Sequence, residues 1–194
     1  MCAIAGIVKF DLRERAERSR LVRMADVQQH RGPDGAGLWL DGAAGLGHRG
    51  RALLDVAGGP PPLSNEDDSI WIVFNGEIYN HAVLRREMQR AGHRYRTKSD
   101  TETILHMYEV YGADCVSRLQ GMFAFAIWDR RQRRLLLVRD RVGIKPLYYA
   151  CTGHELLFAS EIKGIMASGG LKPDFNEAIL PEYLANRYVA GEET

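Results

Sequence analysis

The sequence has few cysteines, no long apolar run and no excess of charge of either sign. Three cysteines, at positions 2, 115 and 151, are too sparse a set for a disulfide framework. No apolar run is long enough to span a membrane, and the start lacks the basic and apolar regions of a signal peptide. The 26 Lys and Arg residues balance 25 Asp and Glu residues, so charge alone indicates neither a nucleic-acid nor a membrane partner. These absences favour a cytoplasmic protein.

The pattern of apolar residues predicts strands and helices in alternating groups. Strands are expected at 3–8, 37–40, 44–47, 53–56, 70–74, 122–128, 135–139, 147–150 and 155–159. Helices are expected at 13–29, 81–91, 100–111, 161–166 and 177–188. Groups of antiparallel strands separated by blocks of helices predict an α+β fold rather than a parallel βαβ repeat. We expect one domain over residues 1–175, with 176–194 beginning a linker or a further domain that is cut short.

The most informative residue is Cys2, directly behind Met1. A small residue at position 2 permits removal of Met1, which would leave Cys2 with a free α-amine. Such an amine titrates near ~8, so it can act as the base for the thiol on the same residue, an arrangement known in covalent catalysis. On position alone, a chance cysteine near the start codon is the simpler interpretation, so the other residues must decide.

Two further segments carry polar groups that suit a reaction site. Asn75-Gly76 follows the apolar run 70–74 and precedes a predicted helix. The Asn75 amide and the Gly76 N–H could form a two-donor oxyanion hole, whereas the alternative is an Asn-Gly hairpin turn. Glu77 and Asp100 are either acids at the start of helices or carboxylates that bind a substrate ammonium.

Seven segments spread over nearly the whole chain combine these features: CAIAG (2–6), HRGPDG (30–35), NGEIYN (75–80), SDTE (99–102), GMFAFAIWD (121–129), RDRVGIKPLYY (139–149) and FASEIK (158–163). Together they resemble the class II glutamine amidotransferases, which are N-terminal-nucleophile hydrolases. The strongest likeness is to the glutaminase domain of glutamine-hydrolysing asparagine synthetases. The resemblance implies a four-layer αββα sandwich of two antiparallel sheets, whereas periodicity alone supports only an α+β fold.

The resemblance also implies a reaction. Cys2 attacks the side-chain amide of L-glutamine, Asn75 and Gly76 hold the oxyanion, and Glu77 and Asp100 bind the substrate α-ammonium. Water then releases glutamate, and the ammonia passes to a C-terminal synthetase domain that uses ATP and Mg for asparagine biosynthesis. The pyrophosphate-binding Ser-Gly-Gly-x-Asp-Ser loop of that domain does not occur in this sequence.

The remaining expectations concern residues and partners around this reaction. Arg31 and Asp34 are expected to brace the loop beside the site rather than react. The six histidines are scattered, so we expect neither a metal nor a cofactor in this domain. Homodimers occur in the family, although the sequence itself shows no interface.

One segment departs from the family pattern. Where relatives carry His-x-Arg-Leu, with an Arg that clamps the glutamine α-carboxylate, this chain has Gly50. On an extended strand Arg49 and Arg51 point to the face opposite residue 50, although a bulge at Gly50 would swing Arg51 inward. Loss of a bidentate arginine–carboxylate pair weakens glutamine binding. Two alternatives therefore stay open: a glutamine-binding regulatory domain with impaired catalysis, and amide transfer to an acceptor other than aspartate.

Overall fold

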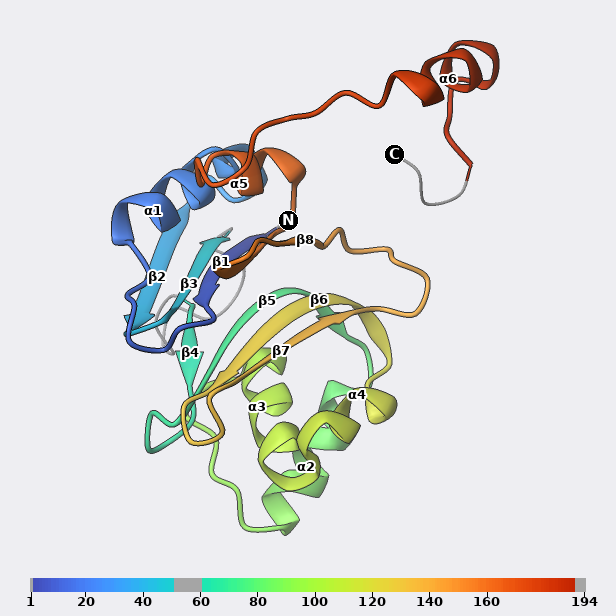
Figure 1. Ribbon diagram of the computed structural model, residues 1–194. Helices are drawn as coiled ribbons and strands as arrows, with labels where there is room; N and C mark the ends of the chain where they lie inside the picture. Colours follow the sequence, from blue (N-terminus) through green and yellow to red (C-terminus); the bar gives the residue numbers. More distant parts are fainter. Residues whose placement is uncertain (1, 51–60, 191–194) are drawn as a thin grey trace.

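The computed structural model describes residues 2–50 and 61–190, which contain two antiparallel β-sheets packed face to face (Figure 1). The first sheet has the order β2-β3-β1-β9-β8. Its strands are β1 (Ala3–Lys9), β2 (Gly35–Asp41), β3 (Ala44–Gly50), β8 (Tyr148–Cys151) and β9 (Glu155–Ala159). The second sheet has the order β4-β5-β6-β7. Its strands are β4 (Leu63–Ser64), β5 (Ile70–Ile78), β6 (Gly121–Asp129) and β7 (Arg134–Arg139).

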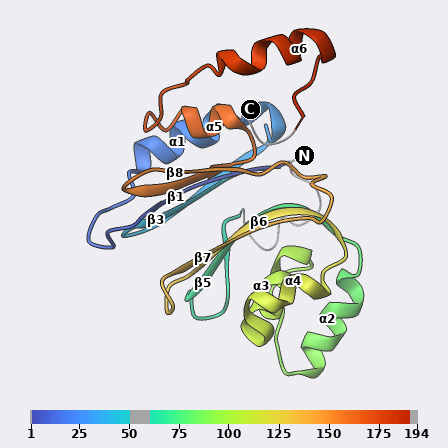
Figure 2. The same cartoon turned by 45° about the vertical axis from the view of Figure 1, so that its right-hand side comes forward.

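Helices cover the outer face of each sheet, which gives the four layers αββα that the family resemblance predicted (Figures 1 and 2). The helices on the first sheet are α1 (Arg18–Asp26) and α5 (Ile162–Met166). Those on the second sheet are α2 (His81–Arg90), α3 (Asp100–Tyr111) and α4 (Cys115–Arg118). Three 3₁₀ turns are η1 (Gln29–Arg31), η3 (Gly112–Asp114) and η4 (Glu177–Ile179). A last helix, α6 (Leu180–Asn186), stands apart from the sandwich at the end of an extended segment (Figure 2).

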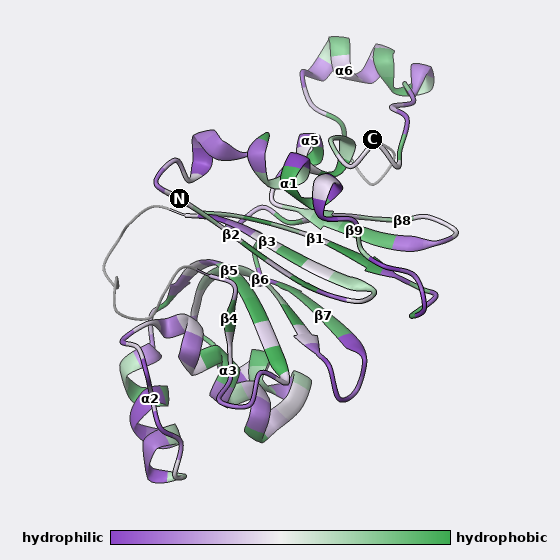
Figure 3. Ribbon diagram, turned by 90° about the vertical axis from the view of Figure 1, so that its left-hand side faces the viewer, coloured by the Kyte–Doolittle hydropathy of each residue, from purple (hydrophilic) through white to green (hydrophobic). Residues whose placement is uncertain are grey.

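Alternating side chains along each strand fill three apolar layers. On β1, Ile4 and Val8 pack between the two sheets, whereas Ala5 and Ile7 pack beneath α1. On β5, Val73 lies between the sheets, and its neighbours in sequence pack against the helices of the second sheet. Figure 3 shows apolar residues concentrated along the strands and polar residues prominent on the helices. Among the described residues, no helix has both the length and the apolar character needed to cross a membrane.

The central strand of the second sheet is longer than predicted. β5 continues through Ile78, in register with the whole of β6, so Asn75-Gly76 lies inside a strand and not after its end. The hairpin-turn alternative is therefore wrong. Close backbone packing explains the glycine, because a Cβ on Gly76 would lie 2.4 Å from the Met122 carbonyl oxygen.

Two helical predictions also need correction. The helix expected at 13–29 is shorter, since α1 begins at Arg18. The residues before it form a turn in which the Arg13 N–H and guanidinium both donate to Asp11, an alternative to helical hydrogen bonding. The helix expected at 177–188 is divided between η4 and α6. The predicted strand at 53–56 lies outside the described residues.

Candidate active site

Cys2 lies at the start of β1, opposite the end of β3. The β1–β3 register pairs Ala3 with Arg49, and its continuation places Cys2 opposite Gly50. Because side chains alternate along a strand, Cys2 shares the face of Ile4, which packs between the sheets. The residue is half-buried. The local fold thus directs residue 2 toward the second sheet and away from the helices.

A charged cluster holds the backbone of Cys2. The Arg31 Nε donates to the Cys2 carbonyl oxygen at 3.3 Å, and Arg31 Nη1 donates to Glu161 Oε1 at 3.1 Å. His30 and Lys163 also contact the Glu161 carboxylate, at 2.9 and 3.1 Å. Burial raises the pKa of Glu161, but the hydrogen bonds from His30, Arg31 and Lys163 outweigh it and lower the pKa to about 2. Arg31 thus joins the backbone of Cys2 to Glu161.

Asn75 lies on the inner face of β5, the face that is turned toward the first sheet. It shares the face of Val73, which packs between the sheets, and β1 and β3 both pack across β5. Asn75 is only 2% exposed. Its Nδ2 has no hydrogen-bond partner among the residues that the structure describes. A buried amide without a partner is costly, so a ligand that supplies an oxygen atom here would satisfy it.

The N–H of Gly76 points away from β6, toward the edge of β5 where no described strand pairs with Gly76. Phe123, its cross-strand partner, directs its N–H and carbonyl to Asp140, at 3.2 and 2.8 Å. The Gly76–Phe123 pair is therefore not hydrogen-bonded, and the Gly76 N–H faces the opposite side. On that side β4 pairs only with Trp71 and Ile72, short of Gly76. Asn75 and Gly76 thus offer two neighbouring donors.

Asp100 lies at the same edge. It is the first residue of α3, whose N-cap is Ser99, and its Oδ2 accepts the Ile78 N–H at 2.9 Å. Burial raises the pKa of Asp100, against the lowering effects of the Ile78 N–H and the His81 charge. Glu77 shares the face of Asn75 by strand alternation and is exposed. The structure therefore places both predicted carboxylates near the end of β5.

Of the two arginines of the divergent segment, the structure describes only Arg49, which is not on this face. Arg49 pairs with Asp26 on α1, on the outer side of the first sheet, and Arg51 lies outside the described residues. On the inner face, His48 is 5% exposed and hydrogen-bonds to the backbone of Phe74. Burial lowers the pKa of His48 to about 4. A Cβ on Gly50 would lie 2.7 Å from His48 Cε1, so position 50 faces the space beside Cys2.

Comparison with known proteins shows the family of the chain. The family model described as a glutamine amidotransferase domain matches residues 1–194.

The chain belongs to the glutamine amidotransferase family.

It is a class II amidotransferase domain homologous to the N-terminal part of glutamine-hydrolysing asparagine synthetases. It is 39% identical over 184 residues to "Asparagine synthetase [glutamine-hydrolyzing] 3" of Bacillus subtilis, covering 94% of this chain and 30% of that protein. It is 43% identical over 167 residues to "Asparagine synthetase [glutamine-hydrolyzing]" of Asparagus officinalis, covering 85% and 28%. The chain thus spans less than a third of the length of these relatives.

The fold has a solved counterpart. The glutamine phosphoribosylpyrophosphate amidotransferase of Bacillus subtilis, in complex with ADP and GMP, superimposes with a TM-score of 0.72 at 21% identity. The match covers 87% of this chain and 44% of that one. At this identity the likeness establishes the shared two-sheet fold.

Within this amidotransferase domain, sequence reasoning missed two contacts beside residue 2. Glu161 holds Arg31 although the two residues are 130 positions apart, and His48 reaches from β3 to the backbone of β5. Arg31, Glu161 and His48 lie in segments that either resemble the family or depart from it. Which residues come into contact, however, depends on the tertiary structure. The other cysteines are poorer nucleophiles or lie elsewhere: burial raises the pKa of Cys115 to about 11, and Cys151 is at the end of β8.

Proposed function

We propose that this chain hydrolyses L-glutamine to glutamate and ammonia through a thioester on Cys2. Removal of Met1 frees the α-amine of Cys2, which takes the thiol proton as the sulfur attacks the side-chain amide carbon. The same amine then protonates the departing ammonia, and water hydrolyses the thioester to glutamate. The mechanism needs no cofactor or metal.

The amide of Asn75, whose Nδ2 has no partner among the described residues, carries this proposal. Its Nδ2 is buried on the inner face of β5, the face that is turned toward the start of β1. In the proposed reaction Asn75 Nδ2 and the Gly76 N–H donate to the oxyanion of the tetrahedral intermediate. Each donor of this kind lowers the barrier by roughly 3–4 kcal/mol. The oxygen of the intermediate also supplies the partner that the Asn75 amide lacks.

The carboxylates at the end of β5 bind the substrate. Asp100 and Glu77 bind the glutamine α-ammonium. Burial disfavours the ionised form of Asp100, and an ammonium ion beside it offsets that effect. The family arginine clamps the glutamine α-carboxylate. In this chain Gly50 replaces that arginine.

The ammonia is proposed to pass to an ATP- and Mg-dependent asparagine synthetase domain in the same cytoplasmic enzyme, which can dimerise. The names of the Bacillus and Asparagus relatives support this product, and those proteins are about three times as long as the match. The alternative is transfer of the amide to an acceptor other than aspartate. Assays on the full-length protein would distinguish the two acceptors.

Glutamate release tests the reaction. The chain incubated with L-glutamine is expected to produce glutamate, and Cys2→Ala to produce none above background. Cys151→Ala, at an exposed cysteine, is the matched control and should keep full activity. Equal glutamate release by wild type and Cys2→Ala would contradict the proposed nucleophile.

A second candidate function, glutamine binding with impaired turnover, is favoured by Gly50 itself. Its Cα lies on the face of Cys2, yet no guanidinium projects from this position. We expect a raised KM for glutamine, and we expect Gly50→Arg to lower it because a bidentate carboxylate contact is restored. The ammonia-dependent activity of a parent synthetase should be spared.

Gly50→Ala is the control for this test, since its Cβ also meets His48 at 2.7 Å but brings no charge. It should leave KM unchanged, while both variants lower the free energy of unfolding through the contact with His48. The same KM in wild type and Gly50→Arg would show that the missing arginine does not limit glutamine use.

A further inference from the structure

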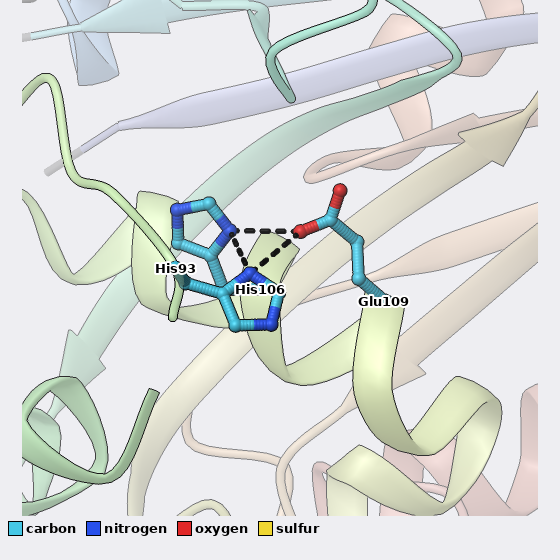
Figure 4. A group of neighbouring side chains, drawn as sticks. All are labelled: His93, His106 and Glu109. Carbon is cyan, nitrogen blue, oxygen red and sulfur yellow. Dashed lines mark hydrogen bonds and ion pairs between the residues drawn. The ribbon is translucent and has the colours of Figure 1, made fainter. Parts of the chain in front are cut away.

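A second group of polar side chains lies on the helix side of the second sheet, away from the space between the sheets. His93 comes from the connection between α2 and α3, and His106 and Glu109 come from one face of α3. Figure 4 shows one atom of each side chain turned toward the other two. The three separations are 3.2 Å between the two Nδ1 atoms, 2.8 Å from His106 Nδ1 to Glu109 Oε2, and 3.3 Å from His93 Nδ1 to the same oxygen.

The triangle can be held by hydrogen bonds or by a bound cation. If only His106 Nδ1 carries a proton, it can donate to Glu109, and the lone pair of His93 Nδ1 then faces the carboxylate. If both Nδ1 atoms carry protons, both N–H groups can donate to Glu109 Oε2. A cation bound by all three lone pairs would take the place of these protons.

The separations match the corners of a tetrahedral metal site. Zinc lies about 2.0–2.2 Å from histidine nitrogen and carboxylate oxygen, which puts neighbouring ligand atoms about 3.3 Å apart. The observed 2.8–3.3 Å therefore fits one ion bound slightly above the plane of the three atoms. Two imidazoles and one carboxylate are a ligand set suited to Zn²⁺ and similar divalent ions.

The surroundings of the three side chains resemble the outer shell of a metal site. Asn65 Nδ2 donates to Glu109 Oε1 at 2.8 Å and so orients the carboxylate. His106 is 1% exposed, and its Nε2 has no hydrogen-bond partner within the described part of the chain. Carboxylate oxygens of Glu66 and Glu102 both lie 3.9 Å from this nitrogen. A histidine that binds metal through one nitrogen commonly presents its other N–H to a carboxylate.

We propose that His93, His106 and Glu109 bind a divalent transition-metal ion such as Zn²⁺, with water as the fourth ligand. The side chains of His93 and Glu109 are 21% and 20% exposed, so an ion can enter from solvent. Binding joins the α2–α3 connection to α3, the helix that begins at Asp100. Sequence spacing did not indicate the site, because its two histidines are 13 positions apart on different elements. The proposal is independent of glutamine hydrolysis.

The test is metal binding to the complete 194-residue chain. Cys2→Ser and Cys151→Ser are introduced first, so that no exposed thiol competes, and chelator-treated protein is titrated with Zn²⁺ against a chromophoric chelator. We expect one saturable equivalent. His93→Gln and Glu109→Gln should each weaken affinity at least about tenfold, because even outer-shell changes reach that size. His154→Gln, at an exposed histidine, is the control and should bind as the parent does.

Co²⁺ binding gives a second readout. The expected absorption spectrum is that of a tetrahedral ion with nitrogen and oxygen ligands and no thiolate band. The buried His106 is left unchanged, and circular dichroism checks that each variant is folded. The proposal is overturned if no saturable equivalent binds, if neither His93→Gln nor Glu109→Gln weakens binding, or if the spectrum is octahedral. Those results would leave a hydrogen-bond cluster only.

Discussion

Hydrogen bonding distinguishes two buried asparagines, one directly after β4 and one within β5. Asn65 is fully engaged: its Nδ2 donates to Ser69 and Glu109, and its Oδ1 accepts from Ser69 and Ile70. Asn75 is equally buried, but its Nδ2 has no partner among the described residues. We therefore expect Asn65 to maintain structure and Asn75 to donate to a ligand.

This difference predicts opposite consequences for two alanine substitutions. Asn75→Ala should reduce kcat for glutamine hydrolysis by about 10²–10³-fold with little change in KM, and should barely change the free energy of unfolding. Asn65→Ala should lower the free energy of unfolding by roughly 2–4 kcal/mol, because several buried groups lose a partner. Steady-state kinetics and urea denaturation check the pair. A normal kcat in Asn75→Ala would remove this residue from the oxyanion hole.

Residue types in the site could be predicted from sequence, but contacts could not. Cys2, Asn75 and Gly76 each have a simpler explanation when taken alone, and the joint occurrence of the seven segments indicated their roles. The link from Arg31 to Glu161 and the triangle around His106 join residues that are distant along the chain. Only the packing of helices and sheets brings such residues together, and periodicity does not encode it.

At the level of elements, β3 and β5 meet through His48. The imidazole is buried between the sheets and hydrogen-bonds to the backbone of Phe74. Burial lowers its pKa from 6.5 to about 4, so the ring is neutral in the folded protein at pH 7. This neutral ring supports the strand that carries Asn75.

The lowered pKa predicts a pH dependence of stability. Between pH 6.5 and about 4, the unfolded chain binds a proton at His48 that the folded chain does not bind. The contribution is therefore fully present above pH 6.5 and is lost as pH falls toward 4. The loss amounts to about 3 kcal/mol.

Urea denaturation from pH 4 to 8 measures this effect as the difference between wild type and His48→Gln. The difference in the free energy of unfolding should grow with pH up to 6.5 and then stay level. His154→Gln, at an exposed site, should parallel wild type throughout. A constant difference between wild type and His48→Gln would mean that His48 titrates normally.

Element types were predicted more reliably than element ends. The apolar runs 3–8 and 70–74 correctly indicated β1 and β5, and the strands expected at 37–40 and 44–47 are β2 and β3. The end of β5 was missed because Gly76 reads locally as a turn residue. A glycine is needed at position 76 because β6 approaches closely at Met122. This is a tertiary contact.

At the scale of the molecule, the sandwich places its two candidate sites on opposite sides of one sheet. Cys2, Gly50 and Asn75 share the space between the sheets, whereas His93 and its partners lie among the helices. The layer order followed from the family resemblance, and the TM-score of 0.72 agrees with it. The predicted boundary at residue 175 is not tested by these comparisons.

Deletion of residues 176–194 tests that boundary. None of the residues of η4 or α6 is buried, and α6 stands apart from the sandwich in Figure 2. The shortened chain should therefore keep its free energy of unfolding within about 0.5 kcal/mol, as for surface changes in general. A loss of more than about 1 kcal/mol in urea denaturation would place this segment within the cooperative domain.

The central claim is that Cys2, as the first residue of the mature chain, is the nucleophile. The most direct measurement is mass spectrometry of the chain before and after treatment with the glutamine analogue diazo-oxo-norleucine, which alkylates a reactive thiolate with loss of nitrogen gas. We predict a chain without Met1, one adduct, and that adduct on Cys2. An adduct confined to Cys115 or Cys151, or an unlabelled chain that begins with Cys2, would contradict the account.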